Sequence, residues 1–460
     1  MMTDMPTSTV LDVKVIPLLQ ELIRNKCVND GTPESGQEIR SARTLEKFFA
    51  AYGIPVEILE SAPGRASLIA RVAGSEPGQP SLAYMNHLDV VPANEETWTV
   101  NPFGGELRGG YVWGRGALDM LTTTATQAVA FAEYVKEKGR APGDFLFLAV
   151  ADEEASGRLG ARWLVENHWD RVRADYMVTE LGGFFTTGAR GETGITITVG
   201  EKGITWLRLK AKGTAGHGSL PWRSDNAAVK IGKALNRLSE YRPKIVFSRE
   251  YTAMVQKSFL SRQMKAALLN KKQCDKALAR LQRTDPGAAK FLHAASRLTV
   301  SPNVVAVGNK INIIPDTGTL ELDIRILPGQ TVEYVIAEVE KALGPLAAEV
   351  DIEVIEYYPS NTSSTDTPLY GATREIVGGV YPLAKTLPYF IGGVTDGRFF
   401  RKKGTVVYGF ALSNEDLTLT EYAALVHGKD ERVSCKSLDL SYHYFSSLPD
   451  IFYRKVRIDG

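Results

Sequence analysis

Side chains that can bind a metal ion or move a proton follow three apolar segments in the first half of the chain. They are His87 and Asp89 after residues 82–85, Glu153 and Glu154 after residues 144–151, and Glu180 after residues 176–178. Apolar segments of this kind predict buried strands, and in open α/β sheets ligands bind beyond the carboxyl ends of the strands. Imidazole and carboxylate groups without thiolates suit zinc, cobalt or manganese. These positions therefore predict a metal site at one rim of a sheet.

His87 and Asp89 are two positions apart. Their side chains point the same way if the strand continues to Asp89. The imidazole can then bind a metal through one nitrogen, while the carboxylate orients the ring through its other N–H group.

Taken alone, each of these residues has a simpler interpretation. A single histidine at a strand end is more often structural than metal-binding, and Asp119, which precedes a predicted helix, could cap that helix. The turn before it, Gly114-Arg115-Gly116, lacks the third glycine of a dinucleotide-binding loop. Polar residues at three strand ends on one rim are less easily explained as unrelated structural residues. In such a site Asp119 could bridge two cations instead of capping the helix.

The composition is that of an ordinary globular enzyme with two or more domains in 460 residues. The 54 basic and 53 acidic side chains nearly cancel, which argues against nucleic acid or an anionic membrane as a partner. Three distant cysteines favour a reducing compartment. Because the sequence also shows no signal peptide and no membrane-spanning apolar run, we expect a cytoplasmic protein.

Strands and helices alternate in the first part of the chain, which predicts an α/β fold. Helices are expected at 10–23, 39–52, 120–138 and 159–167, and further strands at 54–59 and 66–72. After Gly203 the pattern changes, because residues 205–211 alternate as a half-exposed antiparallel strand does. Strands at 304–307, 319–326 and 351–357, with helices at 226–238 and 332–343, predict a small α+β domain. The basic segment 242–297 is best explained as solvated helices.

The residues singled out above resemble the motifs of the M20 metallopeptidases. The resemblance rests on residues 87–92, residues 114–120, Asp152-Glu153-Glu154 with Gly157 and Gly160, and Glu180. The family includes acetylornithine deacetylase, succinyl-diaminopimelate desuccinylase, aminoacylase-1, carboxypeptidases G2 and S, and carnosinase-type dipeptidases. It implies a zinc-peptidase-like mixed sheet flanked by helices. The expected domains are 1–202 and 359–460 for the catalytic part and 203–358 for an inserted α+β lid, with a helical insertion near 242–297.

The resemblance also implies a site with two divalent metal ions, usually Zn²⁺, with Co²⁺ or Mn²⁺ as alternatives. Asp119 would bridge the two ions. His87 and Glu180 would complete one metal site, and Glu154 and His427 the other, while Glu153 would act as the general base.

Residues of the lid and of a later loop would bind the substrate if the resemblance holds. His217 matches a histidine that stabilises the oxyanion and that comes from the neighbouring subunit in dimeric members. A monomer and a homodimer through the lid both stay open at this point. Asn312 and Arg325 match lid residues that hold a substrate carboxylate. Residues 392–399, which include Gly393 and Thr395, match a loop that lines the substrate pocket.

The expected function is hydrolysis of the amide bond of an N-acyl amino acid or of a short peptide with a free carboxylate. One alternative is a dipeptidase that requires a free amine, and a non-enzymatic alternative is an inactive metal-binding scaffold. Two positions depart from the common family pattern, since Leu121 replaces a lysine and Asn86 replaces a serine or threonine. Neither position is an expected ligand, so the departures affect only the assignment to a subfamily.

Overall fold

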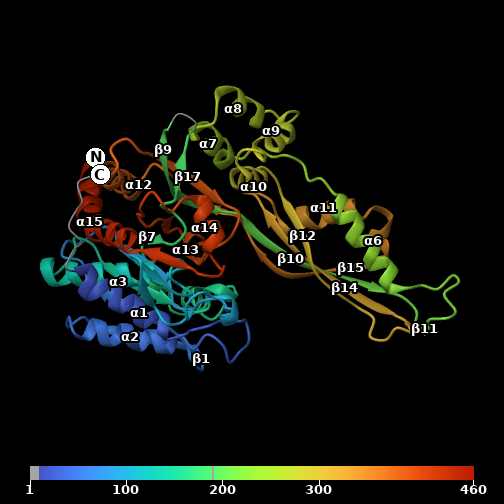
Figure 1. The fold of residues 1–460 in the computed structure, drawn as a ribbon, viewed down its shortest axis with the longest axis horizontal. Helices are drawn as coiled ribbons and strands as arrows, with labels where there is room; N and C mark the ends of the chain where they lie inside the picture. Colours follow the sequence, from blue (N-terminus) through green and yellow to red (C-terminus); the bar gives the residue numbers. More distant parts are fainter. Residues whose placement is uncertain (1–9, 189–190, 460) are drawn as a thin grey trace.

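The computed structural model describes residues 10–188 and 191–459 and consists of a main domain and a long lid (Figure 1). The main domain contains the first and last parts of the chain, and the lid extends away from it as an arm. Within the described residues, no helix combines the length and apolar character that crossing a membrane requires.

A ten-stranded mixed sheet forms the centre of the main domain, with the order β1-β2-β6-β3-β7-β18-β9-β16 and with β8 and β17 also paired to β9. The strands β6, β3, β7 and β18 are parallel neighbours. All residues of β3 and β6 are buried, as expected where helices cover both faces. The strand bounds are β1 Val56–Ala62, β2 Arg65–Val72, β3 Leu82–His87, β6 Phe145–Val150, β7 Tyr176–Thr179, β8 Phe185–Thr187, β9 Thr193–Glu201, β16 Asn361–Thr362, β17 Lys385–Ile391 and β18 Val406–Gly409.

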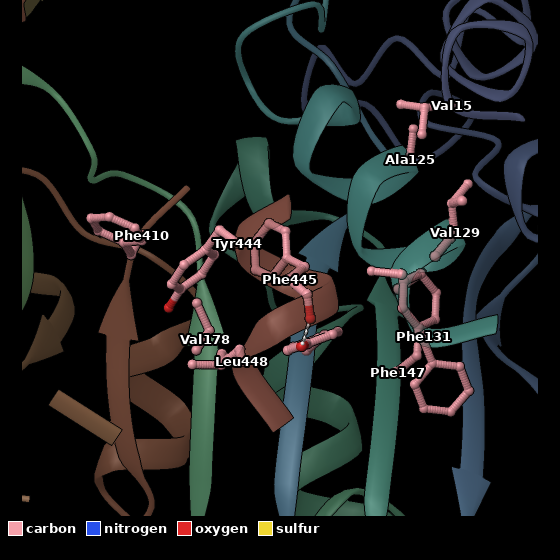
Figure 2. Close-up of a cluster of buried hydrophobic side chains, with 14 of the residues drawn as sticks. Val15, Ala125, Val129, Phe131, Phe147, Val178, Phe410, Tyr444, Phe445 and Leu448 are labelled. Carbon is pink, nitrogen blue, oxygen red and sulfur yellow. Dashed lines mark hydrogen bonds between the residues drawn. The ribbon is translucent and has the colours of Figure 1, made fainter. Parts of the chain in front are cut away.

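Helices cover both faces of this sheet. One face carries a large core with α1 Ile16–Arg24, α2 Ile39–Ala50, α3 Leu121–Lys138, α12 Pro368–Val380 and α15 Cys435–Asp459. The other face carries a smaller core with α4 Ala161–Asn167, α5 Trp169–Val172 and α13 Gly397–Arg401. Figure 2 shows Phe131 of α3 against Phe147 of β6, and Tyr444 and Leu448 of α15 beside Val178 of β7. The strand ends are therefore fixed by packing on both sides.

Two smaller elements of the main domain lie near the predicted metal residues. The strands β4 Glu106–Arg108, β5 Tyr111–Trp113 and β19 Arg432–Ser434 form a three-stranded sheet in the order β19-β5-β4. The helix α14 spans Leu419–Leu425. The sheet brings the glycine-rich turn after β5 next to the segment before β19.

The lid is a four-stranded antiparallel sheet with the order β12-β14-β10-β15, covered by two helices that share its core. A two-stranded ribbon, β11 paired with β13, lies at its far end (Figure 1). The bounds are β10 Gly203–Lys212, β11 Gly216–His217, α6 Ala227–Glu240, β12 Thr299–Val307, β13 Ile313–Ile314, β14 Thr317–Ile326, α11 Val332–Leu343 and β15 Val350–Tyr358.

Four helices between α6 and β12 form a separate helical group, which we call the insertion. They are α7 Arg249–Lys257, α8 Arg262–Leu268, α9 Cys274–Leu281 and α10 Pro286–Ala295. The insertion has its own core, and Phe390 of β17 belongs to it. The insertion therefore packs on the main domain near β9 and β17 and not on the lid tip (Figure 1).

The predicted fold class is confirmed: a mixed α/β sheet flanked by helices, with an inserted α+β lid. The lid sheet begins at Gly203 and ends at Tyr358. The basic residues of the insertion had suggested only a solvated helix face, whereas Tyr251, Val255 and Leu268 form a buried core.

Candidate metal centre

His87 is the last residue of β3 and is 1% exposed. Its Nε2 lies 3.2 Å from Oδ1 of Asp119 and 3.7 Å from Oε2 of Glu180. Burial disfavours the charged imidazole, but the hydrogen bonds with Asp119, Asp89 and Glu180 outweigh burial and raise the pKa of His87. The ring is therefore surrounded by acidic groups on its Nε2 side.

Asp119 lies between two histidines from opposite ends of the chain. Its Oδ1 faces His87, and its Oδ2 lies 3.3 Å from Nε2 of His427. Burial opposes ionisation of this carboxyl group, but hydrogen bonds with His427 and His87 lower its pKa below the usual range. The two oxygens of one carboxylate thus face two different sets of ligand atoms.

Glu153 and Glu154 stand in the short turn after β6. Oε2 of Glu154 lies 3.3 Å from Nε2 of His427, and its Oε1 is buried with no hydrogen-bond partner in the part of the chain that the structure describes. Two glycines allow this turn to approach the rest of the domain: a Cβ on Gly157 would lie 2.2 Å from Oδ1 of Asp396, and one on Gly160 would lie 1.6 Å from the carbonyl oxygen of Ala151.

Glu180 follows β7 directly and is 6% exposed. Burial, and then the negative charge of Asp119, raise the pKa of its carboxyl group to about 8. Burial, followed by the charge of Glu180, raises the pKa of Glu153 well above its usual value. Several buried acids thus face one another, an arrangement that a cation would stabilise.

The residues present fit a metal ion, although they group differently from the predicted ligand sets, because Glu153 lies in one group and His427 in neither. Ligand atoms of His87, Asp119 and Glu154 lie within 4.8 Å of one another, as do those of His87, Glu153 and Glu180. The two sets share His87, and Asp119 connects them to His427. Two imidazole nitrogens with carboxylate oxygens form a donor set that suits zinc. Oε1 of Glu154, which has no hydrogen-bond partner among the described residues, would gain one by binding a cation.

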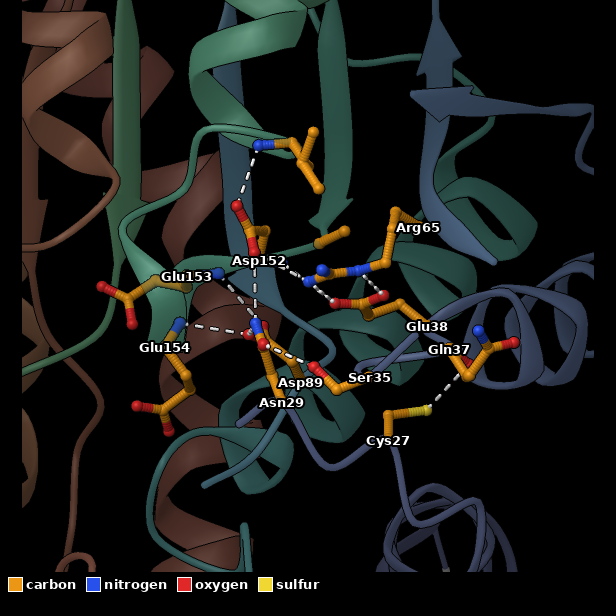
Figure 3. A network of polar contacts seen from close by, with 12 residues as sticks. Cys27, Asn29, Ser35, Gln37, Glu38, Arg65, Asp89, Asp152, Glu153 and Glu154 are labelled. Carbon is orange, nitrogen blue, oxygen red and sulfur yellow. Dashed lines mark hydrogen bonds and ion pairs between the residues drawn. The ribbon is translucent and has the colours of Figure 1, made fainter. Parts of the chain in front are cut away.

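Asp89 is fully buried beside the turn that carries Glu153 and Glu154 (Figure 3). Nδ1 of His87 lies 2.9 Å from the backbone carbonyl oxygen of Asp89 and 3.5 Å from its carboxylate. The carboxylate accepts hydrogen bonds from the backbone N–H groups of Glu153 (3.2 Å) and Glu154 (3.1 Å) and from the side chain of Asn29 (2.8 Å). Asp89 therefore fixes the glutamate turn as well as the histidine.

Arg115 and Glu431 form a buried ion pair of 2.6 Å that the sequence reasoning did not identify as functional. Oε1 of Glu431 accepts from the backbone N–H groups of Leu118 and Asp119, and Arg115 donates to the carbonyl oxygen of His427. The pair thus joins the two loops that carry Asp119 and His427. Arg115 lies within residues 114–120, which carried part of the family resemblance, and Glu431 follows the expected ligand His427 by four positions.

A second buried network supports the turn after β6. Arg65 donates to both oxygens of Glu38 and to Oδ1 of Asp152, and Asn29 also donates to Asp152 (Figure 3). The sequence reasoning assigned no role to Glu38 or Arg65. Together these contacts hold the backbone of Asp152, which adopts a left-handed conformation with φ of 68°.

The predicted substrate residues are not gathered at the metal residues within one chain. His217 lies in β11 at the far end of the lid and is exposed (Figure 1), and the carbonyl oxygen of Asn312 accepts from the N–H group of Gly218 beside it. Arg325 is held by two hydrogen bonds to Asp323.

The predicted loop after β17 lies closer to the junction of the two domains. Gly393 is exposed, whereas Thr395 is buried and donates its backbone N–H group to Glu201, the last residue of β9. Asp396 beside it is buried with both carboxylate oxygens lacking a partner among the described residues, and burial raises its pKa to about 7.

Curated proteins similar to this chain include amide hydrolases. N-fatty-acyl-amino acid synthase/hydrolase PM20D1 of Homo sapiens is 26% identical over 395 residues, which cover 82% of this chain and 75% of that protein. Aminoacylase-1 of Sus scrofa is 24% identical over 415 residues, which cover 88% and 89%.

Solved structures show the same fold. The M20 family metallo-carboxypeptidase Sso-CP2 of Sulfolobus solfataricus matches with a TM-score of 0.73 and 16% identity over 95% of this chain and 99% of that one. The di-peptidase Dug1p of Saccharomyces cerevisiae matches with a TM-score of 0.68 and 16% identity over 96% of both. The sequence profile described as peptidase family M20/M25/M40 matches residues 83–449. The family predicted from the motifs is thereby confirmed: this chain belongs to peptidase family M20/M25/M40.

Proposed function

We propose that this enzyme hydrolyses the amide bond of N-acyl amino acids, or of short peptides with a free carboxylate, with the help of two divalent cations. The observation that carries the proposal is the position of Asp119 between His87 and His427, at 3.2 and 3.3 Å. A carboxylate between two imidazoles can bridge two cations, with Glu180 and Glu154 as the remaining protein ligands. The donor set favours zinc, with cobalt or manganese as alternatives.

When bound, divalent cations would polarise the scissile carbonyl group and lower the pKa of the attacking water. Glu153 would take the proton of that water and pass it to the leaving amine. Asp89 holds the backbone of Glu153, and the carboxylate of Glu153 lies beside ligand atoms of His87 and Glu180, where it could reach the attacking water. Asp89 keeps both His87 and Glu153 in position.

The lid residues support a substrate with a free carboxylate. Arg325 uses Nε and Nη2 for Asp323, which leaves Nη1 for another acceptor. Asn312, Gly393 and the segment around Thr395 would complete the binding site when the lid approaches the main domain. The names of PM20D1 and aminoacylase-1 favour an N-acyl amino acid as the substrate class.

His217 would stabilise the oxyanion from a neighbouring subunit. The lid exposes large apolar side chains, Val304 and Val305 on the edge strand β12 and Leu220 and Trp222 near the tip, and such a surface favours association with a second copy. A homodimer through the lid would place the His217 of one chain near the metals of the other.

The cysteines fit a reducing compartment. Cys27, Cys274 and Cys435 are all free thiols, which supports the proposal that the protein works in the cytoplasm.

Kinetics with two substrate sets test the proposed function. The metal-loaded enzyme is assayed with a panel of N-acetyl amino acids and with the matching unblocked dipeptides. A higher kcat/KM for the N-acyl compounds supports the proposal, and a preference for unblocked dipeptides supports the dipeptidase alternative. No turnover of either set by protein that holds its metals would support an inactive scaffold.

A further inference from the structure

An apolar pocket of about 260 Å³ lies between the insertion and the sheet of the main domain. Met254 and Phe259 line it from the α7 region, Leu292 from α10, and Leu387 and Tyr389 from β17. Neither the family resemblance nor the proposed reaction assigns a role to this pocket. Its size exceeds the cavity of about 150 Å³ that holds benzene in another protein, so it has room for a chain of about ten carbon atoms.

Two hydroxyl groups at this pocket lack hydrogen-bond partners. Tyr389 lines the pocket and is 7% exposed, and its hydroxyl is buried and unpartnered among the described residues, as is Oγ1 of Thr186. Buried hydroxyls are normally paired. The walls of this pocket are mainly apolar, with Asp285 as an acidic residue at its lining. The two unpartnered hydroxyls distinguish it from an ordinary packing defect and point to a bound ligand.

A second hollow of about 700 Å³ adjoins the first and is basic. Ser258, Phe259, Leu260 and Leu387 line both hollows, so the two adjoin along these residues. Its lining residues include the four cations Lys257, Lys265, Arg374 and Lys385.

The cations of this hollow come from both sides of the junction. Lys257 and Lys265 belong to α7 and α8, and Arg374 and Lys385 belong to α12 and β17. Lys265 donates to the carbonyl oxygen of Gln256 at 2.9 Å. Among the described residues of the lining, Glu192 is the one acidic side chain. The hollow therefore suits an anionic group.

We propose that these two hollows form one binding site for a long-chain carboxylate, with the alkyl chain in the apolar pocket and the carboxylate among the four cations. The site is separate from the metal centre. None of the candidate metal ligands lines either hollow. The proposal does not depend on the reaction that the metal centre performs.

The affinity of the full-length protein for octanoate, decanoate and dodecanoate tests the proposal by isothermal titration calorimetry. Each methylene that enters the pocket should tighten binding about fourfold, up to about ten carbon atoms. Decanol, which lacks the charge, should bind more weakly than decanoate. Added salt should weaken binding of decanoate and leave that of decanol nearly unchanged.

Two kinds of variant locate the ligand. Ala288→Phe fills the pocket from α10 and should weaken decanoate binding at least tenfold, whereas Ala279→Phe on the exposed side of α9 should not. Lys257→Gln combined with Lys385→Gln should weaken decanoate but not decanol, and Lys276→Gln with Lys290→Gln is the matched control. Turnover of an N-acetyl amino acid should be the same in all four proteins.

Three results would overturn the proposal. One is the absence of saturable decanoate binding to the wild-type protein. Another is decanoate binding that neither the Ala288→Phe nor the double lysine variant weakens. The third is binding to anionic phospholipid vesicles without binding of soluble decanoate, which would identify the basic hollow as a membrane contact.

Discussion

The carboxylate of Asp119 lies 3.3 Å from the imidazole of His427, and one buried ion pair holds the two loops that carry them. Glu431 accepts hydrogen bonds from the backbone before and at Asp119, while Arg115 binds the carbonyl oxygen of His427. The distance between the two candidate ligands thus depends on residues that are not ligands themselves.

Glu431→Gln should weaken metal binding about 10- to 100-fold, as changes behind metal ligands typically do. The amide keeps the shape but loses the ionic attraction to Arg115, so the loop of His427 is less firmly held. Titration of the metal-free protein with zinc measures the change. Glu421→Gln, on an exposed surface of α14, is the control, and an unaltered affinity in Glu431→Gln would refute the role of the pair.

Glu153→Gln should lower kcat about 10²- to 10⁴-fold, because the amide cannot take a proton from water. Metal content and KM should stay close to those of the wild type, since Glu153 is proposed as a base and not as a ligand. Steady-state kinetics and metal analysis on the same preparation check both statements. Glu166→Gln, an exposed glutamate of α4, should behave as the wild type, and full turnover by Glu153→Gln would remove it from the mechanism.

Mixing two inactive variants shows which subunit supplies His217. In a mixed dimer of His217→Ala and Glu153→Gln, one site would combine an intact Glu153 with an intact His217 from the partner. Because half of the dimers are mixed and each has one complete site, about a quarter of the wild-type activity should return. The assay follows activity after the two proteins exchange subunits. No recovery, despite proven mixing, would mean that His217 acts within its own chain or not at all.

Lys202 makes stability depend on pH. It is fully buried at the base of the lid, where its ammonium donates to the carbonyl oxygens of Ala294 and Arg297, and burial lowers its pKa from 10.5 to about 7. Between these two values the unfolded chain binds more protons than the folded one, so this lysine makes the folded state more stable as the pH rises.

Lys202→Met should lack that rise in stability. Between pH 7 and about pH 9.5, the free energy of unfolding of the wild type should gain up to about 3 kcal/mol relative to the variant. Urea unfolding of both proteins at several pH values measures the difference, with Lys210→Met on the lid surface as the control. A difference that does not change with pH would contradict the lowered pKa.

The sequence predicted the strands that position the candidate ligands, because β3, β6 and β7 are continuous apolar segments followed by polar residues. Burial on both faces requires such segments. The positions of His87, Glu154 and Glu180 could be predicted because each residue stands where one of these strands ends. The sheet of the lid was also predictable, because buried and more exposed side chains alternate along β10 and β14.

Other features depend on contacts between distant parts of the chain. The hydrogen bonds from the backbone of Glu153 and Glu154 to Asp89 need β3 and β6 to be neighbours, and no local pattern in the sequence indicates them. The pairing of Arg115 with Glu431 needs β5 to pair with β19. The distance of His217 from the metal residues reflects the direction of the lid, which is set at its junction with the main domain.

The metal content of the purified protein tests the central claim most directly. Elemental analysis by mass spectrometry, after dialysis against metal-free buffer, should give about two zinc, cobalt or manganese ions per chain for the wild type. Asp119→Ala should retain fewer than one, because it removes the group between both sites, whereas Asp416→Ala should retain two. A wild-type protein that stays active with its metals fully removed, or an Asp119→Ala variant that keeps both ions, would contradict the account.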